Sequence, residues 1–373
     1  MTIYLDYNAT SPMLPVVRER LNELEPLPLN ASSVHSMGRK AKQILEESRS
    51  IIANFISAWP DEIIFTAGGT EANNLALKGL PDRVLMVAAT EHSSVIEIAK
   101  DRGGVFLAVH ADGLLDMAAL ETSLKAHEGR ALVSVMLLNN ETGLIQPIKE
   151  IAALVHRYGG LMHCDAVQAI GKLAFDFTTL GVDMLTIAAH KVGGPKGVGA
   201  LVVKNTVQLL PQLLGGGQEK RRRAGTENVA AIAGFAALIE NLPDLSFLTP
   251  LREQLETQMA KISPQSILVG KGAGRVSNTV SILTPGLSSE LQLMHLDLAG
   301  ICVSAGSACS SGRIDPSHVL QAQGYSKAEA ASAIRISMGW ATTEMEIDAL
   351  LQSWGKLVAN HSQSAENKGK RLA

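Results

Sequence analysis

The sequence predicts an α/β domain with a mostly parallel mixed sheet, followed by a smaller α+β domain. Short β-type runs recur through the first two thirds of the chain with helical stretches between several of them, and this alternation is typical of a sheet covered by helices. After about Pro250 the pattern changes to one long helix followed by shorter strands. The length of 373 residues also favours two domains over one.

The first predicted elements lead into a glycine-rich turn. Apolar residues fall at helical spacing over residues 41–57, a short β-type run covers 63–66, and a helix over 71–78 follows Gly68, Gly69 and Thr70. Further strands are predicted over residues 83–88, 105–109, 131–138, 161–163, 183–188 and 198–203, with a helix over 148–158. We therefore assign residues 15–250 to the large domain.

The remaining elements form the predicted small domain. A helix is expected over residues 251–261, and short strands over 276–282 and 334–338. We assign residues 251–373 to this domain, together with residues 1–14 from the start of the chain. The segment from about His361 onward is polar and is expected to fray.

The composition excludes several classes of function. The net charge of −3 leaves no polybasic field for nucleic acid or an anionic membrane. Asp6 interrupts the apolar start of the chain, so no signal peptide is expected, and no later apolar run reaches the roughly 18 residues of a membrane helix. Three cysteines without metal-ligand spacing indicate neither a disulfide framework nor a metal site, which favours a cytoplasmic location.

Polar residues follow three neighbouring strands at the points where these strands end. They are Asn139, Asn140, Glu141, Asp165, Gln168, His190 and Lys191. Open α/β sheets bind ligands beyond the carboxyl ends of their strands. A pyridine aldehyde cofactor needs a lysine that forms a Schiff base and an aspartate that pairs with the pyridine nitrogen, so this set predicts such a cofactor.

The glycine-rich turn adds a candidate phosphate site. Gly68, Gly69 and Thr70 lead into a helix N-terminus, where backbone N–H groups and the helix dipole bind anions. Each residue also has a simpler interpretation, because the turn could only cap the helix, Asp165 could be another cap, and Lys191 could lie on the surface. Lys191, however, stands between an apolar strand and a glycine-rich turn, where surface lysines are rare. The constellation is more specific than any member.

Eight stretches of the chain carry a resemblance to a known family. They are residues 4–10 (YLDYNAT), 65–74 (FTAGGTEANN), 90–95 (TEHSSV), 139–143 (NNETG), 165–168 (DAVQ), 189–191 (AHK), 223–228 (RAGTEN) together with 307–309 (SAC). In this order they resemble the cysteine desulfurases of iron–sulfur cluster assembly, within the fold-type I pyridoxal-phosphate enzymes. The resemblance covers nearly the whole chain, from Tyr4 to about Ile347.

The resemblance implies a role for each residue around the cofactor ring. Lys191 would carry pyridoxal 5'-phosphate covalently, and Asp165 would pair with the pyridine nitrogen. Gln168 would donate a hydrogen bond to the phenolic oxygen, with Asn140 beside that oxygen or the ring. His92 would stack on the ring face and help to move protons. By itself, a lone histidine at a strand end is more often a packed or capping residue.

The resemblance also implies the phosphate contacts and the oligomeric state. Gly69, Thr70 and His190 would bind the phosphate, and Thr226 would reach the phosphate of the partner subunit, so a homodimer is expected. Ala188 departs from the family pattern, because relatives often carry a serine there that bonds the phosphate. The loss of one such bond is typically worth about 1 kcal/mol.

Arg335 is the candidate substrate anchor. An arginine inside the apolar run 333–336 (AIRI) is costly to bury without an anionic partner, and a guanidinium can bind a carboxylate through two parallel hydrogen bonds. The resemblance implies that Arg335 binds the carboxylate of L-cysteine, with Asn30 nearby. The alternative is a structural ion pair with a carboxylate of the protein. Ala31 replaces a common proline, so the loop near Asn30 is expected to be less rigid.

Cys309 determines the expected reaction. It lies in a run of small residues, 304–312 (SAGSACSSG), which packs little and gives a nucleophilic thiol access. Cys164 and Cys302 lie in apolar runs and are expected in the core. By the resemblance, Cys309 would take sulfur from L-cysteine as a persulfide and release L-alanine. The alternative is an exposed, inert cysteine.

The resemblance implies partners as well as a reaction. A sulfur-acceptor or iron–sulfur scaffold protein would receive the persulfide sulfur, although the short C-terminus puts scaffold docking in question. Selenocysteine lyase and aminotransferase activities remain alternatives within the same fold. A non-catalytic, partner-binding homologue is the alternative from another class, and the intact Lys191, Asp165, Arg335 and Cys309 argue against it.

Overall fold

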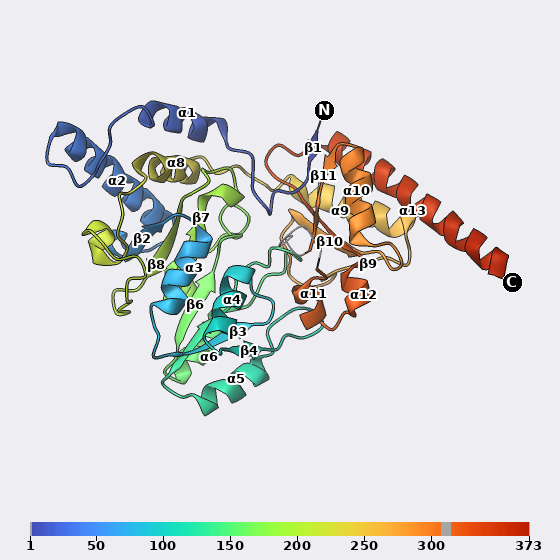
Figure 1. The fold of residues 1–373 in the computed structure, drawn as a ribbon, viewed down its shortest axis with the longest axis horizontal. Coiled ribbons are helices and arrows are strands. Elements are labelled where there is room, and N and C mark those ends of the chain that lie inside the picture. The colour runs from blue at the N-terminus through green and yellow to red at the C-terminus, as the bar shows by residue number, and fades with distance from the viewer. Residues whose placement is uncertain (1, 307–314, 373) are drawn as a thin grey trace.

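The computed structural model describes residues 2–306 and 315–372, apart from the side chains of 362 and 364–372. Two lobes lie side by side, with the central sheet in one and most of the C-terminal third of the chain in the other (Figure 1). Cys309 lies outside the described residues.

A seven-stranded mixed sheet forms the centre of the large lobe. In spatial order its strands are β2 (Ile63–Thr66), β8 (Gly199–Val203), β7 (Met184–Ala188), β6 (Leu161–Asp165), β5 (Ala131–Ser134), β3 (Val84–Ala88) and β4 (Val105–Leu107). Only β8 runs antiparallel to its neighbours, and the pairs from β7 to β4 are all parallel. The predicted mostly parallel mixed sheet is therefore confirmed.

Helices cover both faces of this sheet. The helices of the large lobe are α1 (Pro15–Leu24), α2 (Ser36–Phe55), α3 (Gly69–Lys78), α4 (Ser93–Asp101), α5 (Met117–Ala126), α6 (Ile148–Arg157), α7 (Phe177–Leu180) and α8 (Val229–Glu240), with short 3-10 turns η1 (Pro60–Glu62), η2 (Ala189–Lys191) and η3 (Gln218–Arg221). Alternate strand residues enter two apolar clusters, one with α2, α5, α6 and α8 and the other with α3 and α4. Because both faces are buried, the strands read as continuous apolar runs.

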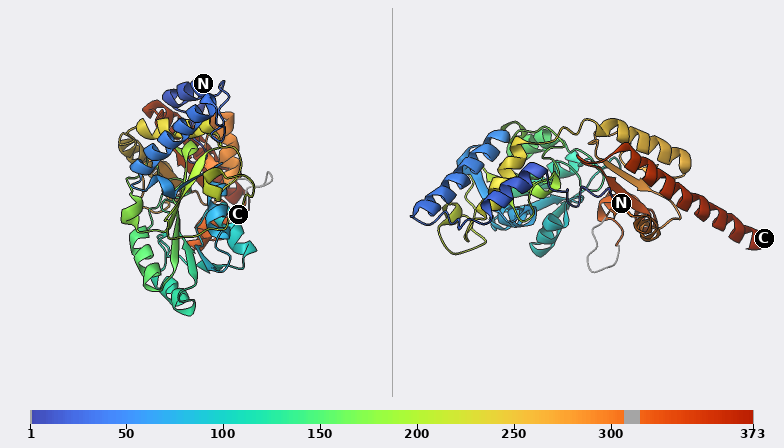
Figure 2. Two further views of the ribbon diagram at one scale, coloured as in Figure 1. Left: turned by 90° about the vertical axis from the view of Figure 1, so that its left-hand side faces the viewer. Right: turned by 90° about the horizontal axis from the view of Figure 1, so that it is seen from above.

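The small lobe has its own core. Its antiparallel sheet has the order β12 (Ser304–Ala305), β13 (Ala333–Ser337), β10 (Thr279–Leu283), β9 (Ile267–Leu268), and α9 (Leu248–Ile262), α10 (Ser289–Leu298), α11 (His318–Ala322), α12 (Lys327–Ala330) and α13 (Glu344–Leu372) accompany it. Trp354 is fully buried in this core, which also contains Leu5. The helix α13 begins in this core and continues to Leu372, so the segment from about His361, predicted to fray, is helical. The C-terminal part of α13 projects away from the two lobes (Figure 2).

The N-terminal segment joins the two lobes. The strand β1 (Ile3–Tyr4) pairs in parallel with β11 (Ile301–Cys302) of the small lobe, and residues 5–14 then cross to the large lobe, where α1 begins. Leu5 N–H and Leu14 N–H bond to carbonyl groups of Cys302 and Gly193, one in each lobe. Within the part of the chain that the structure describes, no helix has the length and apolar character needed to cross a membrane.

Candidate active site

A cavity of about 190 Å³ opens at the carboxyl ends of the parallel strands. Eight predicted residues line it: Gly69, Thr70, His92, Asn140, Asp165, Gln168, His190 and Lys191. Five further residues also line it: Asn73, Ser94, Met136, Leu138 and Val167. The parallel sheet brings these side chains together, because β6 and β7 end at the same edge and the loops after them turn into the cavity.

Asp165, the last residue of β6, is held by two N–H donors. Its Oδ1 accepts from Val167 N–H at 2.9 Å, and its Oδ2 accepts from Asn73 Nδ2 at 2.8 Å. Asn73 lies one helical turn after Thr70 in α3, and its own Oδ1 is buried without a partner. Sequence reasoning missed Asn73, although its spacing from Thr70 could have placed it on the same helix face.

The Lys191 amine is held by the N-terminal segment. Its Nζ donates to the backbone carbonyls of Asn8 and Ala9, both at 2.9 Å. Burial and the charge of Arg335 lower the pKa of Lys191 to about 8, against the opposing effect of Asp165. A substantial fraction of the amine is therefore neutral and nucleophilic at moderately alkaline pH.

The N-terminus of α3 faces the cavity without a side-chain cap. Gly68 stands at the cap position, with φ 150°, and makes no capping hydrogen bond. The first N–H groups of a helix have no partner within it, so they are available to an anion. A Cβ at Gly69 would lie 2.6 Å from Val167 Cγ2, which explains why glycine occupies this close approach. His190 also lines the cavity. Burial and the charge of Lys191 lower the pKa of His190 to about 4.

His92 combines the two interpretations that the sequence leaves open. It caps α4, because its Nδ1 accepts from Ser94 N–H at 3.1 Å, and its ring also lines the cavity. Burial lowers the pKa of His92, against the opposing charge of Asp165. The ring is therefore neutral near pH 7, and its Nε2 is the nitrogen not used by the cap.

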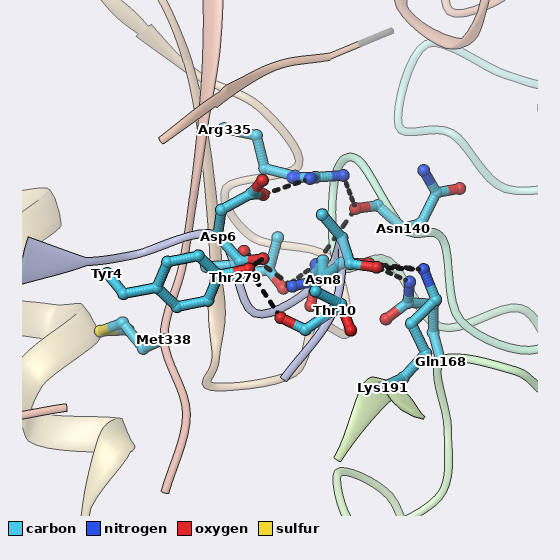
Figure 3. A network of polar contacts seen from close by, with 12 residues as sticks. Tyr4, Asp6, Asn8, Thr10, Asn140, Gln168, Lys191, Thr279, Arg335 and Met338 are labelled. Carbon is cyan, nitrogen blue, oxygen red and sulfur yellow. Dashed lines mark hydrogen bonds and ion pairs between the residues drawn. The ribbon is translucent and has the colours of Figure 1, made fainter. Parts of the chain in front are cut away.

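Arg335 lies beside the cavity and is 5% exposed. Its Nη2 donates to Asp6 Oδ1 at 2.6 Å and its Nη1 donates to the Asn140 carbonyl at 3.1 Å, whereas its Nε is buried without a partner (Figure 3). The ion pair with a protein carboxylate, considered above as an alternative, is thus present. Burial of Arg335 is compensated by Asp6, and the guanidinium retains further N–H groups for a second anion.

The residues of the cavity fit pyridoxal phosphate. They supply an amine with a lowered pKa, a carboxylate held in place and an uncapped helix N-terminus, which match the aldehyde, the pyridine nitrogen and the phosphate of this cofactor. The unpartnered Asn73 Oδ1 shows that the polar wall is incomplete without a further group. Among the described residues, no three His, Cys, Asp or Glu side chains are grouped as metal ligands.

The family model described as aminotransferase class-V matches residues 3–350. The chain belongs to the class-V aminotransferase family. Enzymes of this family and its cysteine desulfurases depend on pyridoxal phosphate, which agrees with the predicted cofactor. The match spans both lobes, from β1 to α13.

Relatives of the class-V chain are cysteine desulfurases. This chain is 38% identical to the IscS-like cysteine desulfurase of Mycobacterium tuberculosis, and the alignment covers 97% of this chain and 98% of the relative. It is 37% identical to the cysteine desulfurase IscS of Dictyoglomus turgidum, covering 95% and 94%. Among solved structures, a NifS-like protein from Rickettsia africae superposes with a TM-score of 0.90 at 36% identity, covering 96% and 100%. The predicted resemblance and fold type are confirmed.

Of the predicted site residues that the structure describes, Arg335 lies beside the cavity, whereas Asn30 and Thr226 do not line it. Asn30 is exposed, and its Oδ1 accepts from Ser32 N–H at 2.9 Å. Thr226 is exposed and lines a separate cavity of about 220 Å³. Cys309 lies outside the described residues.

The residues on either side of the segment 307–314 converge on Glu141. Ser317 Oγ donates to Glu141 Oε2 at 2.5 Å, and a Cβ at Gly306 would lie 2.6 Å from the same oxygen. Burial raises the pKa of Glu141 to about 7. Because Glu141 follows Asn140 directly, Gly306 and Ser317 both lie close to the wall of the cavity.

Proposed function

We propose that this class-V chain is a cysteine desulfurase that converts L-cysteine to L-alanine and leaves the sulfur on Cys309 as a persulfide. The observation that carries the proposal is that the Lys191 amine and the Asp165 carboxylate line one cavity with the uncapped start of α3. The similarity of the whole chain to proteins named cysteine desulfurase supports the same reaction.

The chain's residues suggest how the cofactor would be held. Lys191 would bind the aldehyde carbon, Asp165 the pyridine nitrogen, and Gln168 and Asn140 the side of the phenolic oxygen, with His92 on the ring face. The phosphate contacts would come from Gly69, Thr70 and His190. When bound, pyridoxal phosphate withdraws electrons from the substrate Cα and so stabilises the charge left when its proton departs.

Lys191 is the proposed base for the substrate Cα proton. Its pKa of about 8 leaves part of the amine neutral near neutral pH, and Asn8 and Ala9 provide two carbonyl acceptors that fix its position when it is free. A base whose pKa is close to the working pH transfers protons most effectively. The neutral His92 ring lies in the same cavity wall, where its Nε2–H can donate a hydrogen bond, and we retain His92 as the group that would help to move a second proton.

Arg335 is the proposed substrate-binding residue. Asp6 and the Asn140 carbonyl fix the plane of its guanidinium, and the unpartnered Nε shows that its donors are not exhausted. A substrate carboxylate would add charge-assisted hydrogen bonds to these donors. We retain Asn30 as a further substrate contact, which would have to approach from a neighbouring subunit or by movement of its loop.

Cys309 is the proposed acceptor of the sulfur. Its thiolate would attack the substrate sulfur, forming an S–S bond while the Cβ–S bond breaks. The electron pair of that bond stays with Cβ, which takes a proton and becomes the methyl group of alanine. No external oxidant is needed, because the sulfur is oxidised and the carbon is reduced in the same step.

The reaction is tested by measuring alanine and sulfide from L-cysteine in the presence of a thiol reductant. The wild-type protein should release the two products in equal amounts. Cys309→Ser should lose sulfide release but keep the visible absorbance of the lysine-bound cofactor, and Lys191→Ala should lose both. Cys302→Ser, which changes a cysteine of β11, is the matched control. Full activity of Cys309→Ser, or release of a keto acid in place of alanine, would refute the proposal.

We also propose that the chain forms a homodimer. Thr226 is exposed and does not line the cavity of its own subunit, as expected if it serves the partner subunit. Large apolar side chains are exposed near this region of the sequence, including Leu210, Leu213 and Leu214, the last at 84%. Light scattering should give twice the subunit mass of 39.5 kDa, and Leu214→Asp should shift the protein toward the monomer. A monomeric wild-type protein would contradict the proposal.

The remaining expectations belong to the same proposal. A sulfur-acceptor or iron–sulfur scaffold protein would receive the persulfide in the cytoplasm, and transfer of radioactive sulfur to a captured protein is the test. Two separate cores, with Leu5 in the second, support a division into residues 15–250 and residues 1–14 with 251–373, although Leu14 packs in the first core and Leu248 in the second. Independent expression of residues 15–250 would test it.

A further inference from the structure

Lys172 is a second lysine close to the active site, where it contacts the cavity residue Gln168, and the proposed reaction does not use it. It lies one turn after Gln168, on the segment that follows β6. Its Nζ donates to Gln168 Oε1 at 2.6 Å and to Asn8 Oδ1 at 2.8 Å. The residue also borders a different cavity of about 380 Å³ between the two lobes, so it separates that cavity from the active site.

We propose that Lys172 is a positioning residue that holds Gln168 and Asn8 in one arrangement. It thereby places the Asn8 backbone carbonyl, which accepts a hydrogen bond from the Lys191 amine. The inference rests on the proposed cofactor site, and it assigns to Lys172 a role in building that site and no step of the reaction.

The Gln168 carboxamide has only one orientation that satisfies its neighbours. Its Oε1 accepts from the Lys172 amine, and its Nε2 donates to the Asn8 carbonyl at 2.9 Å. A flipped amide would place its oxygen against the Asn8 carbonyl oxygen, so that contact would become repulsive. The second Nε2 proton is left for the cavity that Gln168 lines, where an anionic oxygen of the cofactor could accept it.

Asn8 is the residue through which Lys172 reaches Lys191. The Asn8 backbone carbonyl accepts from Lys191 Nζ and from Gln168 Nε2, and the Asn8 side chain donates to Thr279 Oγ1 at 2.9 Å (Figure 3). The Asn8 Oδ1 accepts from Lys172 at 2.8 Å and from Asn278 Nδ2 at 3.1 Å. Removal of the Lys172 amine therefore takes away the shorter of the two hydrogen bonds to Asn8 Oδ1, in the residue whose backbone carbonyl accepts from Lys191.

The protonation of Lys172 suits a positioning role. Burial lowers the pKa of Lys172 well below its usual value, and the charges of Lys191 and Arg335 lower it further. An amine in its neutral form still donates two hydrogen bonds. It can therefore hold both acceptors without adding a further positive charge beside Lys191.

The test is Lys172→Met in the full-length protein, with Lys149→Met as the control. Met keeps the aliphatic stem and removes the donor, and Lys149 is an exposed residue of α6. We expect the dissociation constant for pyridoxal phosphate to rise about tenfold in Lys172→Met, as expected for the loss of one or two hydrogen bonds. The pH midpoint of the visible absorbance of the bound cofactor should also shift, because Gln168 is no longer held. Lys149→Met should match the wild type in both measurements.

Hydrogen exchange provides a readout that does not depend on the cofactor or on desulfurase activity. In the cofactor-free protein, Lys172→Met should speed amide exchange in residues 6–10 relative to the wild type. Unchanged exchange together with an unchanged dissociation constant and absorbance midpoint would overturn the proposal, even if the enzyme is active. If Lys172→Met shows the expected changes in these three readouts but the wild type has no desulfurase activity, the proposed function is refuted and the positioning role stands.

A measurement on the unmodified protein covers the case in which Lys172→Met does not fold. Competitive acetylation of the cofactor-free wild type is measured as a function of pH and read by mass spectrometry. The rate constant of the neutral Lys172 amine should be at least tenfold below that of the neutral amine of the exposed Lys149, because the Lys172 amine is engaged with two acceptors. Equal rate constants would overturn the proposal. Borohydride reduction of the loaded protein should fix the cofactor on Lys191, and its recovery on Lys172 would overturn the positioning role.

Discussion

The lowered pKa of Lys191 predicts how fast the cofactor-free protein captures pyridoxal phosphate at different pH values. The neutral amine is the nucleophile, so the rate should rise with pH and level off above the pKa. With a pKa of about 8 in place of the usual 10.5, roughly 9% of the amine is neutral at pH 7, against roughly 0.03% for an exposed lysine. The predicted advantage at pH 7 is thus about 300-fold in reactive amine.

The second part of this prediction concerns Arg335. Burial is the larger cause of the lowered Lys191 pKa, and the Arg335 charge is the next. Arg335→Gln removes the charge but leaves most of the burial. The midpoint of the capture rate should therefore move upward from about 8 and stay below 10.5, since a like charge is removed while desolvation remains.

Stopped-flow absorbance provides the assay for both parts. The cofactor-free protein is mixed with pyridoxal phosphate between about pH 6.5 and about pH 11.5, and the rate of appearance of the visible band is recorded. The same measurement with a small lysine derivative serves as the control. The ratio of the two rates removes the effect of the ionisation of pyridoxal phosphate itself. A midpoint near 10.5 for the wild type would refute the reasoning, and so would an Arg335→Gln midpoint below that of the wild type.

Three further predictions concern stability and are read by urea or thermal unfolding. Arg49→Met should lower the free energy of unfolding by about 3–5 kcal/mol, because Glu219, 6% exposed, loses a partner that bonds both of its oxygens. Arg221→Gly should raise it by about 1 kcal/mol, because Arg221 is exposed and holds φ at 65°. Gly339→Ala should lower it by about 1–3 kcal/mol, because the added Cβ would lie 1.9 Å from the Tyr7 ring.

Matched variants serve as controls for these stability changes. Arg20→Met breaks an exposed ion pair with Glu23 and should change stability by no more than about 1 kcal/mol. Gly274→Ala adds a Cβ that meets nothing within 4 Å and should be near neutral. If Arg49→Met lowered the free energy of unfolding no more than Arg20→Met, the buried Arg49–Glu219 ion pair would not make the stabilising contribution assigned to it. A stability loss in Arg221→Gly would contradict the assigned backbone strain, and equal effects of the two alanine variants would contradict the clash.

The alternation of strands and helices was sufficient to predict the large lobe. The strand over 63–66 has the predicted bounds, and the helix over 148–158 ends one residue earlier than predicted, at Arg157. The strand predicted over 131–138 ends at Ser134, although Val135 and Leu137 still donate backbone hydrogen bonds to β6. The strand predicted from 276 begins at Thr279, because Val276 N–H bonds to Gly143 of the large lobe instead. Such contacts between lobes leave no periodic signal in the sequence.

The candidate site could be predicted where the chain order reflects the sheet. Asp165 and Lys191 follow adjacent parallel strands, so their meeting at one edge was predictable. Asn8 and Lys172 were missed, because Asn8 comes from a segment without regular structure and Lys172 enters through its hydrogen bonds alone. Thr226 could not be placed with the others, because in one subunit it lines a different cavity.

The route of the N-terminal segment has a consequence for protein synthesis. Its residues leave the ribosome before those of the two lobes, but the hydrogen bond from Asn8 N–H to Ser337 Oγ joins residues 329 positions apart. The strand β1 likewise cannot pair until Ile301 has been synthesised. The seven-stranded sheet can form while the last hundred residues are still being translated. The two carbonyl groups that receive the Lys191 amine are fixed only after β13 has emerged, because contacts of such long sequence separation form late. In a nascent chain the sheet can therefore form before the Lys191 amine meets its two carbonyl acceptors.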